Sequence, residues 1–296
     1  MKKTVFTGSG VAIITPFNEN GIDFESFGKI IDFHLENSTD AIIVCGTTGE
    51  AATMPDAEHL SAIEFTVKRV NGKIPVIAGT GSNDTVHGIK LSVEAEKLGA
   101  DALLVVTPYY NKSNKQGLIN HFKAIAGAVS LPIILYNVPS RTGMNIALDV
   151  LEGLQSVENI VGIKEASGNM SYLMELAAKY GDRFDIYSGN DDIIVPVMSA
   201  GGKGVISVLA NVLPKETHDI CQLYLDGKCE ESMRLQFKYL DLINSLFCEV
   251  NPIPVKTAMN LMGMNGGILR MPLYEMAPAN KERLIKDLKA AGVKLV

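Results

Sequence analysis

The sequence has no long apolar run and no block of like charge. Its apolar runs, such as residues 102–106, fall far short of the roughly 18 residues that suggest a membrane-spanning helix. Lys and Arg number 27 against 33 Asp and Glu, and the resulting net charge of −6 disfavours electrostatic binding to nucleic acid. We therefore expect a soluble protein that associates with neither membranes nor nucleic acids.

The sequence also lacks the residue spacings of a metal, disulfide or dinucleotide site. Its four cysteines form no CxxC pair, which favours reduced thiols in a cytoplasmic protein. Its five histidines show neither HxH nor HxxxH spacing, and residues 79–81 (GTG) lack the third glycine of a dinucleotide-binding fingerprint. These residues are Cys45, Cys221, Cys229 and Cys248, and His34, His59, His87, His121 and His218. We predict neither a metal ion nor an organic cofactor.

The sequence does contain enough apolar residues for a large core. Of its 296 residues, 47% are hydrophobic and 20% are charged, a balance that argues against disorder. Eight short β-branched or apolar runs have starts 21 to 35 residues apart, close to the roughly 30 residues of a strand, a crossover helix and the next strand. They cover residues 11–14, 41–44, 76–78, 102–106, 133–136, 160–163, 184–187 and 205–208.

These runs are continuously apolar rather than alternating, which is typical of parallel strands covered on both faces. Helical segments lie between them. Before one of these, Thr53 can cap the helix and Pro55 can occupy its first turn. The apolar positions of that helix are Leu60, Ile63, Phe65 and Val67. Eight such units favour a closed (β/α)8 TIM barrel over an open doubly wound sheet.

The 85 residues after Asn211 exceed the roughly 12 that one closing helix needs. Apolar periodicity at residues 235–246 and 283–291 predicts further helices, separated by the proline-containing stretch Asn251–Pro254. We therefore predict two parts, a barrel with the active site at residues 1–225 and a C-terminal helical subdomain at residues 226–296.

Lys164 ends the sixth predicted strand. In such a barrel the active site is built from the carboxyl ends of the strands and the loops that follow them, and alternation places Gly162, Lys164 and Ala166 on one face. Burial there disfavours the ammonium ion and favours the neutral amine that forms an imine with a carbonyl substrate. The alternative is a strand-end lysine paired with Glu165.

The loops after three other strands carry hydroxyl groups and an arginine. The motif GTTGE at residues 46–50 either cradles a small carboxylate or phosphate or forms an ordinary turn. The segments TPYYN at 107–111 and YNVPSRTG at 136–143 bring phenols and Arg141 to the barrel mouth. A tyrosine that is hydrogen-bonded to another hydroxyl group can relay protons, and an arginine can bind a carboxylate. Taken alone, each tyrosine is also consistent with a packing role and Arg141 with a solvent-exposed one.

Five segments in this order resemble the dihydrodipicolinate synthase (4-hydroxy-tetrahydrodipicolinate synthase) family, of the N-acetylneuraminate lyase superfamily of pyruvate-dependent class I aldolases. They are GTTGE at 46–50, VTPYYN at 106–111, LYNVPSRTG at 135–143, GIKEA at 162–166 and NPIPVK at 251–256. The likeness spans nearly the whole chain. It implies a lyase that condenses pyruvate with L-aspartate 4-semialdehyde in the diaminopimelate route to lysine, through a lysine Schiff base and without a cofactor.

The resemblance also implies catalytic roles. Lys164 matches the Schiff-base lysine, and Tyr136 matches the residue that shuttles protons during imine formation and cyclisation. Thr47 and Tyr110 match its relay partners. In the family this last tyrosine comes from the partner subunit across a tight dimer interface. The resemblance therefore implies self-association, as a homotetramer made of two tight dimers.

Four further positions match residues that bind substrate in the family. Thr48 matches the ligand of the pyruvate carboxylate, Arg141 matches the ligand of the aldehyde substrate's carboxylate, and the backbones of Gly189 and Ile206 line the pocket. N-acetylneuraminate lyases and keto-sugar-acid aldolases are alternatives, but they usually lack this arginine. A phosphate-binding barrel or a catalytically silent pyruvate sensor is the alternative from another class, and a silent sensor is expected to lack the lysine or the shuttling tyrosine.

The positions linked to regulation depart from the family pattern. Members inhibited by lysine often use a serine just after GTTGE, a histidine at the start of the following helix and a glutamate after the third strand. Here those places hold Ala51, Asp56 and His87, so we expect poor or absent inhibition by lysine. Other positions of that site do match, namely His59, Asn83 and Tyr109.

Overall fold

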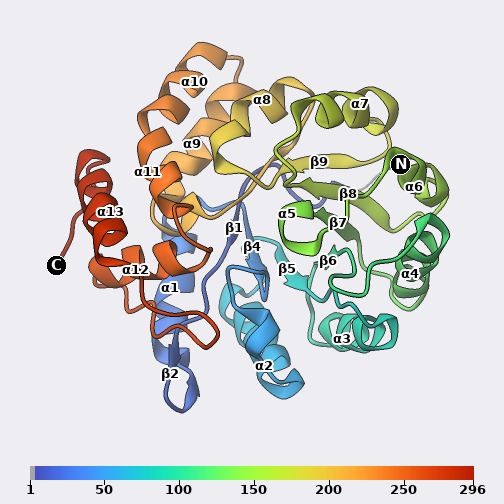
Figure 1. The fold of residues 1–296 in the computed structure, drawn as a ribbon, viewed down its shortest axis with the longest axis horizontal. Helices are drawn as coiled ribbons and strands as arrows, with labels where there is room; N and C mark the ends of the chain where they lie inside the picture. Colours follow the sequence, from blue (N-terminus) through green and yellow to red (C-terminus); the bar gives the residue numbers. More distant parts are fainter. Residues whose placement is uncertain (1–3) are drawn as a thin grey trace.

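The computed structural model describes residues 4–296, and its centre is a closed barrel of eight parallel strands (Figure 1). The barrel strands are β1 (Gly8–Ala12), β4 (Ala41–Val44), β5 (Val76–Gly79), β6 (Ala102–Val106), β7 (Ile133–Asn137), β8 (Ile160–Glu165), β9 (Asp185–Ser188) and β10 (Gly204–Ser207). β1 pairs with both β4 and β10, which closes the sheet. The predicted TIM barrel is confirmed, and residues 1–3 of its predicted range lie outside the described residues.

Helices cover the outside of the barrel between successive strands (Figure 1). They are α1 (Phe24–Glu36), α2 (Asp56–Val70), α3 (Thr85–Lys97), α4 (Lys115–Gly127), α5 (Pro139–Thr142), α6 (Leu148–Leu154), α7 (Met170–Tyr180), α8 (Ile194–Ser199) and α9 (Pro214–Leu225). Among residues 4–296, no helix combines the length and the apolarity needed to cross a bilayer.

Further helices follow the barrel, as the sequence predicts. They are α10 (Cys229–Lys238), α11 (Leu240–Leu246), α12 (Ile253–Leu261) and α13 (Pro278–Ala290). The proline-containing stretch does more than separate them, because α12 begins within it and Pro254 lies in the first turn, where a missing N–H costs no helical hydrogen bond. A small hairpin, β2 (Phe17–Asn18) and β3 (Gly21–Ile22), follows β1 and bridges to Ile268 near the C-terminus.

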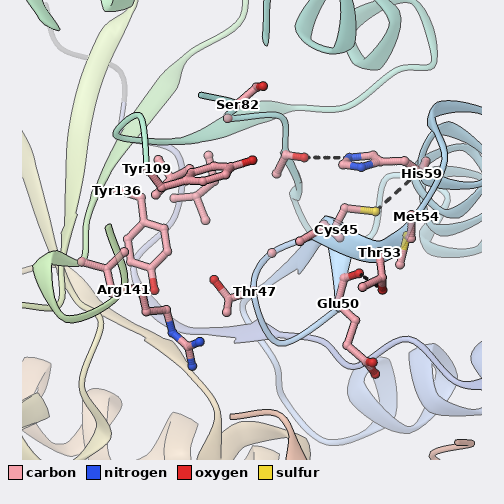
Figure 2. A pocket seen from close by; sticks show the side chains of 18 of the residues that line it. Cys45, Thr47, Glu50, Thr53, Met54, His59, Ser82, Tyr109, Tyr136 and Arg141 are labelled. Atoms are coloured by element: carbon pink, nitrogen blue, oxygen red, sulfur yellow. Dashed lines mark hydrogen bonds between the residues drawn. The ribbon is translucent and has the colours of Figure 1, made fainter. Parts of the chain in front are cut away.

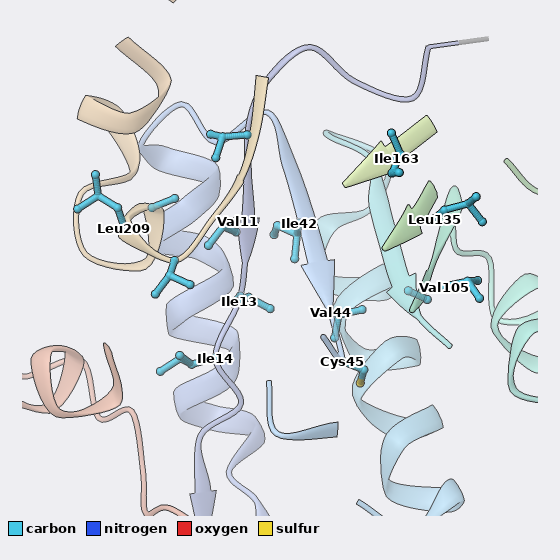
Figure 3. Close-up of a cluster of buried hydrophobic side chains, with 14 of the residues drawn as sticks. Val11, Ile13, Ile14, Ile42, Val44, Cys45, Val105, Leu135, Ile163 and Leu209 are labelled. Carbon is cyan, nitrogen blue, oxygen red and sulfur yellow. The ribbon is translucent and has the colours of Figure 1, made fainter. Parts of the chain in front are cut away.

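The barrel strands are buried on both faces because successive side chains alternate between two cores. In β4, Ala41 and Ile43 point to the barrel interior, where they join Ile77, Leu104 and Ile134. Ile42 and Val44 of the same strand pack outward against the helices, in a cluster with Val105, Leu135 and Ile163 (Figure 3). Covering by helices therefore explains the continuous apolar runs in the sequence.

The first strand begins earlier than its apolar run predicts. The predicted strand covers residues 11–14, whereas β1 is Gly8–Ala12. At Gly10 a Cβ atom would lie 2.7 Å from the Ile43 side chain and 2.8 Å from the Phe6 ring. Glycine permits this close approach, and a pattern of apolar residues does not register it.

Helix α2 also begins differently from the prediction. It starts at Asp56 with Pro55 in the cap position and with no side-chain cap. Thr53 lies in a short 3-10 helix, η1 (Ala51–Thr53), and its hydroxyl donates to the carbonyl of Glu50 over 3.0 Å. The prediction that Thr53 caps the helix is wrong, because its hydroxyl finds an acceptor in the preceding turn. The predicted apolar positions of this helix do pack against the core, namely Leu60, Ile63, Phe65 and Val67.

An ion pair at the amino-terminal end of the barrel joins β1, the start of β4 and α9. The Asp40 carboxylate accepts from the Ser9 backbone N–H over 2.7 Å and lies 2.8 Å from Nδ1 of His218. The hydrogen bond to Asp40 raises the pKa of His218 above its ordinary value of 6.5, against the opposing effect of partial burial. Because α9 follows the last strand, the pair ties the end of the barrel to its beginning.

The raised pKa means that folding favours the charged imidazolium, so the pair contributes fully below about pH 6.5 and is lost as pH rises through the pKa of the folded state. We expect His218→Gln to lower the free energy of unfolding by about 0.5–1 kcal/mol near about pH 5.5 and by little near about pH 9. Urea denaturation at both pH values measures this. In an Asp40→Asn background the effect should not depend on pH, and a pH-independent loss in the original background would contradict the ion pair.

Candidate active site

The carboxyl ends of the strands surround a cavity of about 160 Å³, at the place where barrels of this kind carry their active sites. It adjoins a larger cavity of about 460 Å³ (Figure 2), and both cavities are lined by residues that follow β4 and β7. The structure brings most of the predicted site residues together around the smaller cavity, namely Thr47, Thr48, Tyr136, Arg141, Lys164 and Gly189.

Lys164 in β8 and Tyr136 in β7 are register partners at the ends of neighbouring strands. Their side chains therefore leave the sheet on the same side. Lys164 Nζ lies 4.4 Å from the centroid of the Tyr136 ring, and the two residues are only 6% and 8% exposed. A buried amine thus lies against a phenol in the wall of the cavity.

Glu165 is not the partner of Lys164. Alternation turns its side chain to the other face of β8, where the carboxylate accepts from Asn137 Nδ2 over 2.7 Å and from the Ser167 backbone N–H over 2.6 Å. Burial raises the pKa of this carboxyl, while the two hydrogen bonds oppose the shift. The alternative of a Lys164–Glu165 pair is therefore wrong, and the carboxyl of Glu165 serves to join β8 to the loop after it.

The GTTGE loop turns sharply after β4. Cys45 and Glu50 at its two ends have left-handed backbone angles, φ 56° and φ 57°. Between them the Thr48 side chain is 3% exposed, and its Oγ1 accepts from Asn251 Nδ2 over 3.0 Å. Thr47 faces the cavity across from Tyr136 (Figure 2). The loop therefore presents two threonines in different settings, one open to the cavity and one fixed by a residue from the C-terminal part.

A buried ion pair lies beneath this loop. Glu50 Oε1 is 2.7 Å from Lys256 Nζ, and both side chains are 1% exposed. Lys256 Nζ also donates to the carbonyls of Thr15 and Ile268, and the second oxygen of Glu50 accepts from the Arg270 backbone N–H over 3.0 Å. Burial lowers the pKa of Lys256, and the charge of Glu50 opposes this. Removing one partner of such a pair strands a buried charge, so the loop and α12 are fixed to each other.

Arg141 lies in α5, the short helix that follows β7. Its Nη2 donates to the backbone carbonyl of Asn251 over 3.0 Å, and the guanidinium group lies beside Tyr136 at the edge of the cavity (Figure 2). The side chain is exposed, so most of its donors stay available to an incoming anion. Arg141 thus places a positive charge at the entrance.

Gly189 lines the smaller cavity, whereas Ile206 belongs to the apolar interior of the barrel. At Gly189 a Cβ atom would lie 3.1 Å from Lys164 Cε and 2.6 Å from the Ala166 Cβ, so glycine leaves room for the lysine side chain. Ile206 is 1% exposed and belongs to the apolar interior with Ile43. It lines neither cavity, in contrast to the role that the family resemblance implies for its backbone.

Tyr110 points away from the site of its own chain. Its side chain is 94% exposed, and its backbone is left-handed with φ 69°. Its neighbour Tyr109 lines the larger cavity. A non-glycine residue held in this strained region is uncommon and is often linked to function. A single chain therefore does not bring Tyr110 to Tyr136.

Asp56 and His87 line the larger cavity and belong to a cluster of polar groups. Asp56 accepts from Lys90 Nζ over 2.8 Å and from His87 Nε2 over 2.9 Å. These hydrogen bonds, from Lys90 first and from His87 second, lower the pKa of Asp56 to about 2. Ala51 also lines this cavity, and His59 Nε2 is 2.8 Å from the carbonyl of Gly79. The polar groups at this place are therefore already paired with one another.

Comparison with known proteins identifies the family. A model described as the Dihydrodipicolinate synthetase family matches residues 5–291. The chain belongs to this family. The 4-hydroxy-tetrahydrodipicolinate synthase of Caldicellulosiruptor saccharolyticus is 59% identical over 292 residues, which cover 98% of this chain and 99% of that protein. The resemblance predicted from the five sequence motifs is confirmed.

Solved structures of the dihydrodipicolinate synthetase family have the same fold. The crystal structure of dihydrodipicolinate synthase from Aquifex aeolicus has a TM-score of 0.96 and 46% identity, covering 98% of this chain and 99% of that chain. A structure described as the first monomeric dihydrodipicolinate synthase variant has a TM-score of 0.94 and 42% identity, covering 98% of both chains. The barrel and its C-terminal helices are therefore shared across the family.

Three residues of the site are not among the sequence predictions. Asn251, Glu50 and Lys256 connect the GTTGE loop to the C-terminal part through direct hydrogen bonds. Glu50, Asn251 and Lys256 do lie inside motifs shared with the dihydrodipicolinate synthetase family, which is the one sequence feature that points to them. Their pairing could not be predicted, because the partners are more than 200 residues apart in sequence.

Proposed function

We propose that this chain is a lyase that condenses pyruvate with L-aspartate 4-semialdehyde, the 4-hydroxy-tetrahydrodipicolinate synthase reaction of lysine and diaminopimelate biosynthesis. The observation that supports it most directly is the buried amine of Lys164, in register with Tyr136 at the barrel mouth. Membership of the dihydrodipicolinate synthetase family and a 59% identical relative of that name support the choice of substrates.

In the proposed reaction Lys164 Nζ attacks the keto carbon of pyruvate. The resulting carbinolamine loses water to give a protonated imine, with Tyr136 and Thr47 passing the protons. The imine draws electrons from the methyl group, which loses a proton to form an enamine. The enamine carbon then bonds to the aldehyde carbon of the second substrate. Attack of that substrate's amine on the imine carbon closes a ring and returns Lys164 as the free amine.

Both substrates carry a carboxylate, and two residues of the site suit them. We assign the pyruvate carboxylate to Thr48, which lines the smaller cavity with Lys164. We assign the carboxylate of the semialdehyde to Arg141, whose guanidinium lies at the entrance and suits a planar anion. The same arginine disfavours N-acetylneuraminate lyase and the keto-sugar-acid aldolases. We keep the backbone of Gly189 as proposed lining of the pocket, and we do not extend that role to Ile206, which lines neither cavity.

Borohydride reduction in the presence of pyruvate tests the Schiff base. Because an imine is reduced to a stable amine, we expect a pyruvate adduct on Lys164 in the peptide map. Lys164→Ala should abolish the adduct and the condensation activity. Lys123→Ala, which removes an exposed lysine on α4, is the control that should retain both. An adduct on a different lysine would contradict the mechanism.

We also propose that the active assembly is a tetramer of two tight dimers, with Tyr110 of one subunit completing the proton relay of its partner. The exposure of Tyr110 and its left-handed backbone support this assignment. Because one family structure is described as a monomeric variant, the oligomeric state of this chain needs its own test. In this proposal residues 1–225 carry the chemistry in the cytoplasm, and the helical residues 226–296 complete the fold.

Subunit complementation tests the shared site. Lys164→Ala and Tyr110→Ala chains should each be nearly inactive alone. In a mixed dimer, however, the chain that retains Lys164 receives Tyr110 from the other, so each mixed dimer contains one complete site. Co-expression should therefore restore activity. Mixed dimers without activity, or a fully active monomer in sedimentation, would contradict the proposal.

We propose that L-lysine inhibits this enzyme weakly, because Ala51, Asp56 and His87 replace the residue types that inhibited family members use. The ion pair of Asp56 with Lys90 and its hydrogen bond with His87 also occupy the polar groups at that place. Titration of the condensation rate with L-lysine should show little change at physiological concentrations. The triple variant Ala51→Ser, Asp56→His and His87→Glu should gain sensitivity. Strong inhibition of the unaltered enzyme would disprove this.

A further inference from the structure

Asn251 contacts both side chains to which a substrate carboxylate is assigned. Its Nδ2 donates to Thr48 Oγ1 over 3.0 Å, and its backbone carbonyl accepts from Arg141 Nη2 over 3.0 Å. The residue is 6% exposed and lines both cavities. A residue of the C-terminal part therefore connects the two proposed carboxylate sites.

The bond from Asn251 determines how Thr48 uses its hydroxyl. A hydroxyl donates one hydrogen and accepts through its lone pairs. Thr48 Oγ1 accepts from Asn251, and within residues 4–296 no group accepts the hydrogen of that hydroxyl. The hydrogen is then left for a ligand in the cavity. A hydroxyl that donates to a carboxylate forms a charge-assisted bond, stronger than one between neutral groups.

Arg141 is held through the backbone of Asn251 instead. The main-chain carbonyl engages one N–H group of the guanidinium and leaves the others for a second carboxylate. Replacing the side chain of Asn251 keeps this bond while it removes the bond to Thr48. The two contacts of Asn251 can therefore be separated by mutagenesis.

Two further observations concern the placement of Asn251. Lys256, which follows in α12, is anchored to Glu50 of the same loop over 2.7 Å, so the segment is held at both ends. In addition, Oδ1 of Asn251 is buried and has no hydrogen-bond partner among the described residues. An unpaired buried acceptor is costly, and a native protein retains few of them. The orientation of this amide is thus maintained despite a cost.

We propose that Asn251 is a positioning residue that orients the Thr48 hydroxyl toward the carboxylate of pyruvate and holds Arg141 for the carboxylate of the second substrate. The inference rests on the proposed function, since that function assigns the two carboxylates. It gives the C-terminal part of the chain a direct part in substrate binding.

A double-mutant cycle tests the action of Asn251 through Thr48. The readout is the pyruvate concentration that half-saturates the borohydride adduct on Lys164. Thr48→Val should raise it by about 10- to 100-fold and Asn251→Ala by about 5- to 10-fold, as expected for loss of a charge-assisted bond and for loss of its orientation. The double variant should resemble Thr48→Val alone, because the effects are coupled. The kcat for condensation at saturating substrates should change less than the pyruvate KM.

Two variants control for packing and fold. Asn251→Asp preserves the shape of the side chain but replaces the amide donor with an acceptor, so it must also raise the half-saturating concentration. Asn244→Ala, at an exposed position of α11, should leave it unchanged. Additive effects in the cycle, or normal pyruvate saturation in Asn251→Ala or Asn251→Asp, would overturn the inference alone. Absence of an adduct on Lys164 in the unaltered enzyme would overturn the proposed function as well.

Discussion

The ion pair between Glu50 and Lys256 is the constraint on which the site depends. Both charges are buried, and two charges removed from water must remain together, since either one alone would be strongly destabilising. Glu50 ends the loop that carries Thr47 and Thr48, and Lys256 belongs to α12. The pair therefore fixes the position of a barrel loop relative to a helix outside the barrel. The loop in turn determines where its two threonine hydroxyl groups lie.

The barrel supplies the reactive groups by a simpler rule. Closure of the parallel sheet puts Lys164 and Tyr136 in register on neighbouring strands, and alternation turns both toward the interior. Rigid strands hold these two groups, whereas the groups assigned to the substrate carboxylates lie in the loop after β4 and in the short helix α5 after β7. Such a division keeps the amine and the phenol in constant geometry while the loops determine which acid is accepted.

The sequence predicts most of what depends on local patterns. The apolar runs identify eight strands, and alternation within the sixth predicts that Lys164 faces the barrel interior. The apolar pattern misses the start of β1, where the strand needs the close packing that Gly10 permits. It also misassigns Thr53 as a helix cap, because the Thr53 hydroxyl donates to a carbonyl outside the predicted helix. Asn251 could not be assigned a role because its contacts with Thr48 and Arg141 are 203 and 110 residues apart in sequence, and no spacing rule describes them.

The pairing of β1 with β10 also has a consequence for synthesis on the ribosome. The first strand cannot complete its hydrogen bonds until the last strand has emerged, so the nascent barrel keeps an open edge through most of translation. Asn251 and Lys256 emerge later still. A chain released early would expose an unpaired strand edge, and its Glu50 carboxylate would lack the Lys256 cation. Cellular quality control would therefore meet the unfinished barrel before the site could bind substrate.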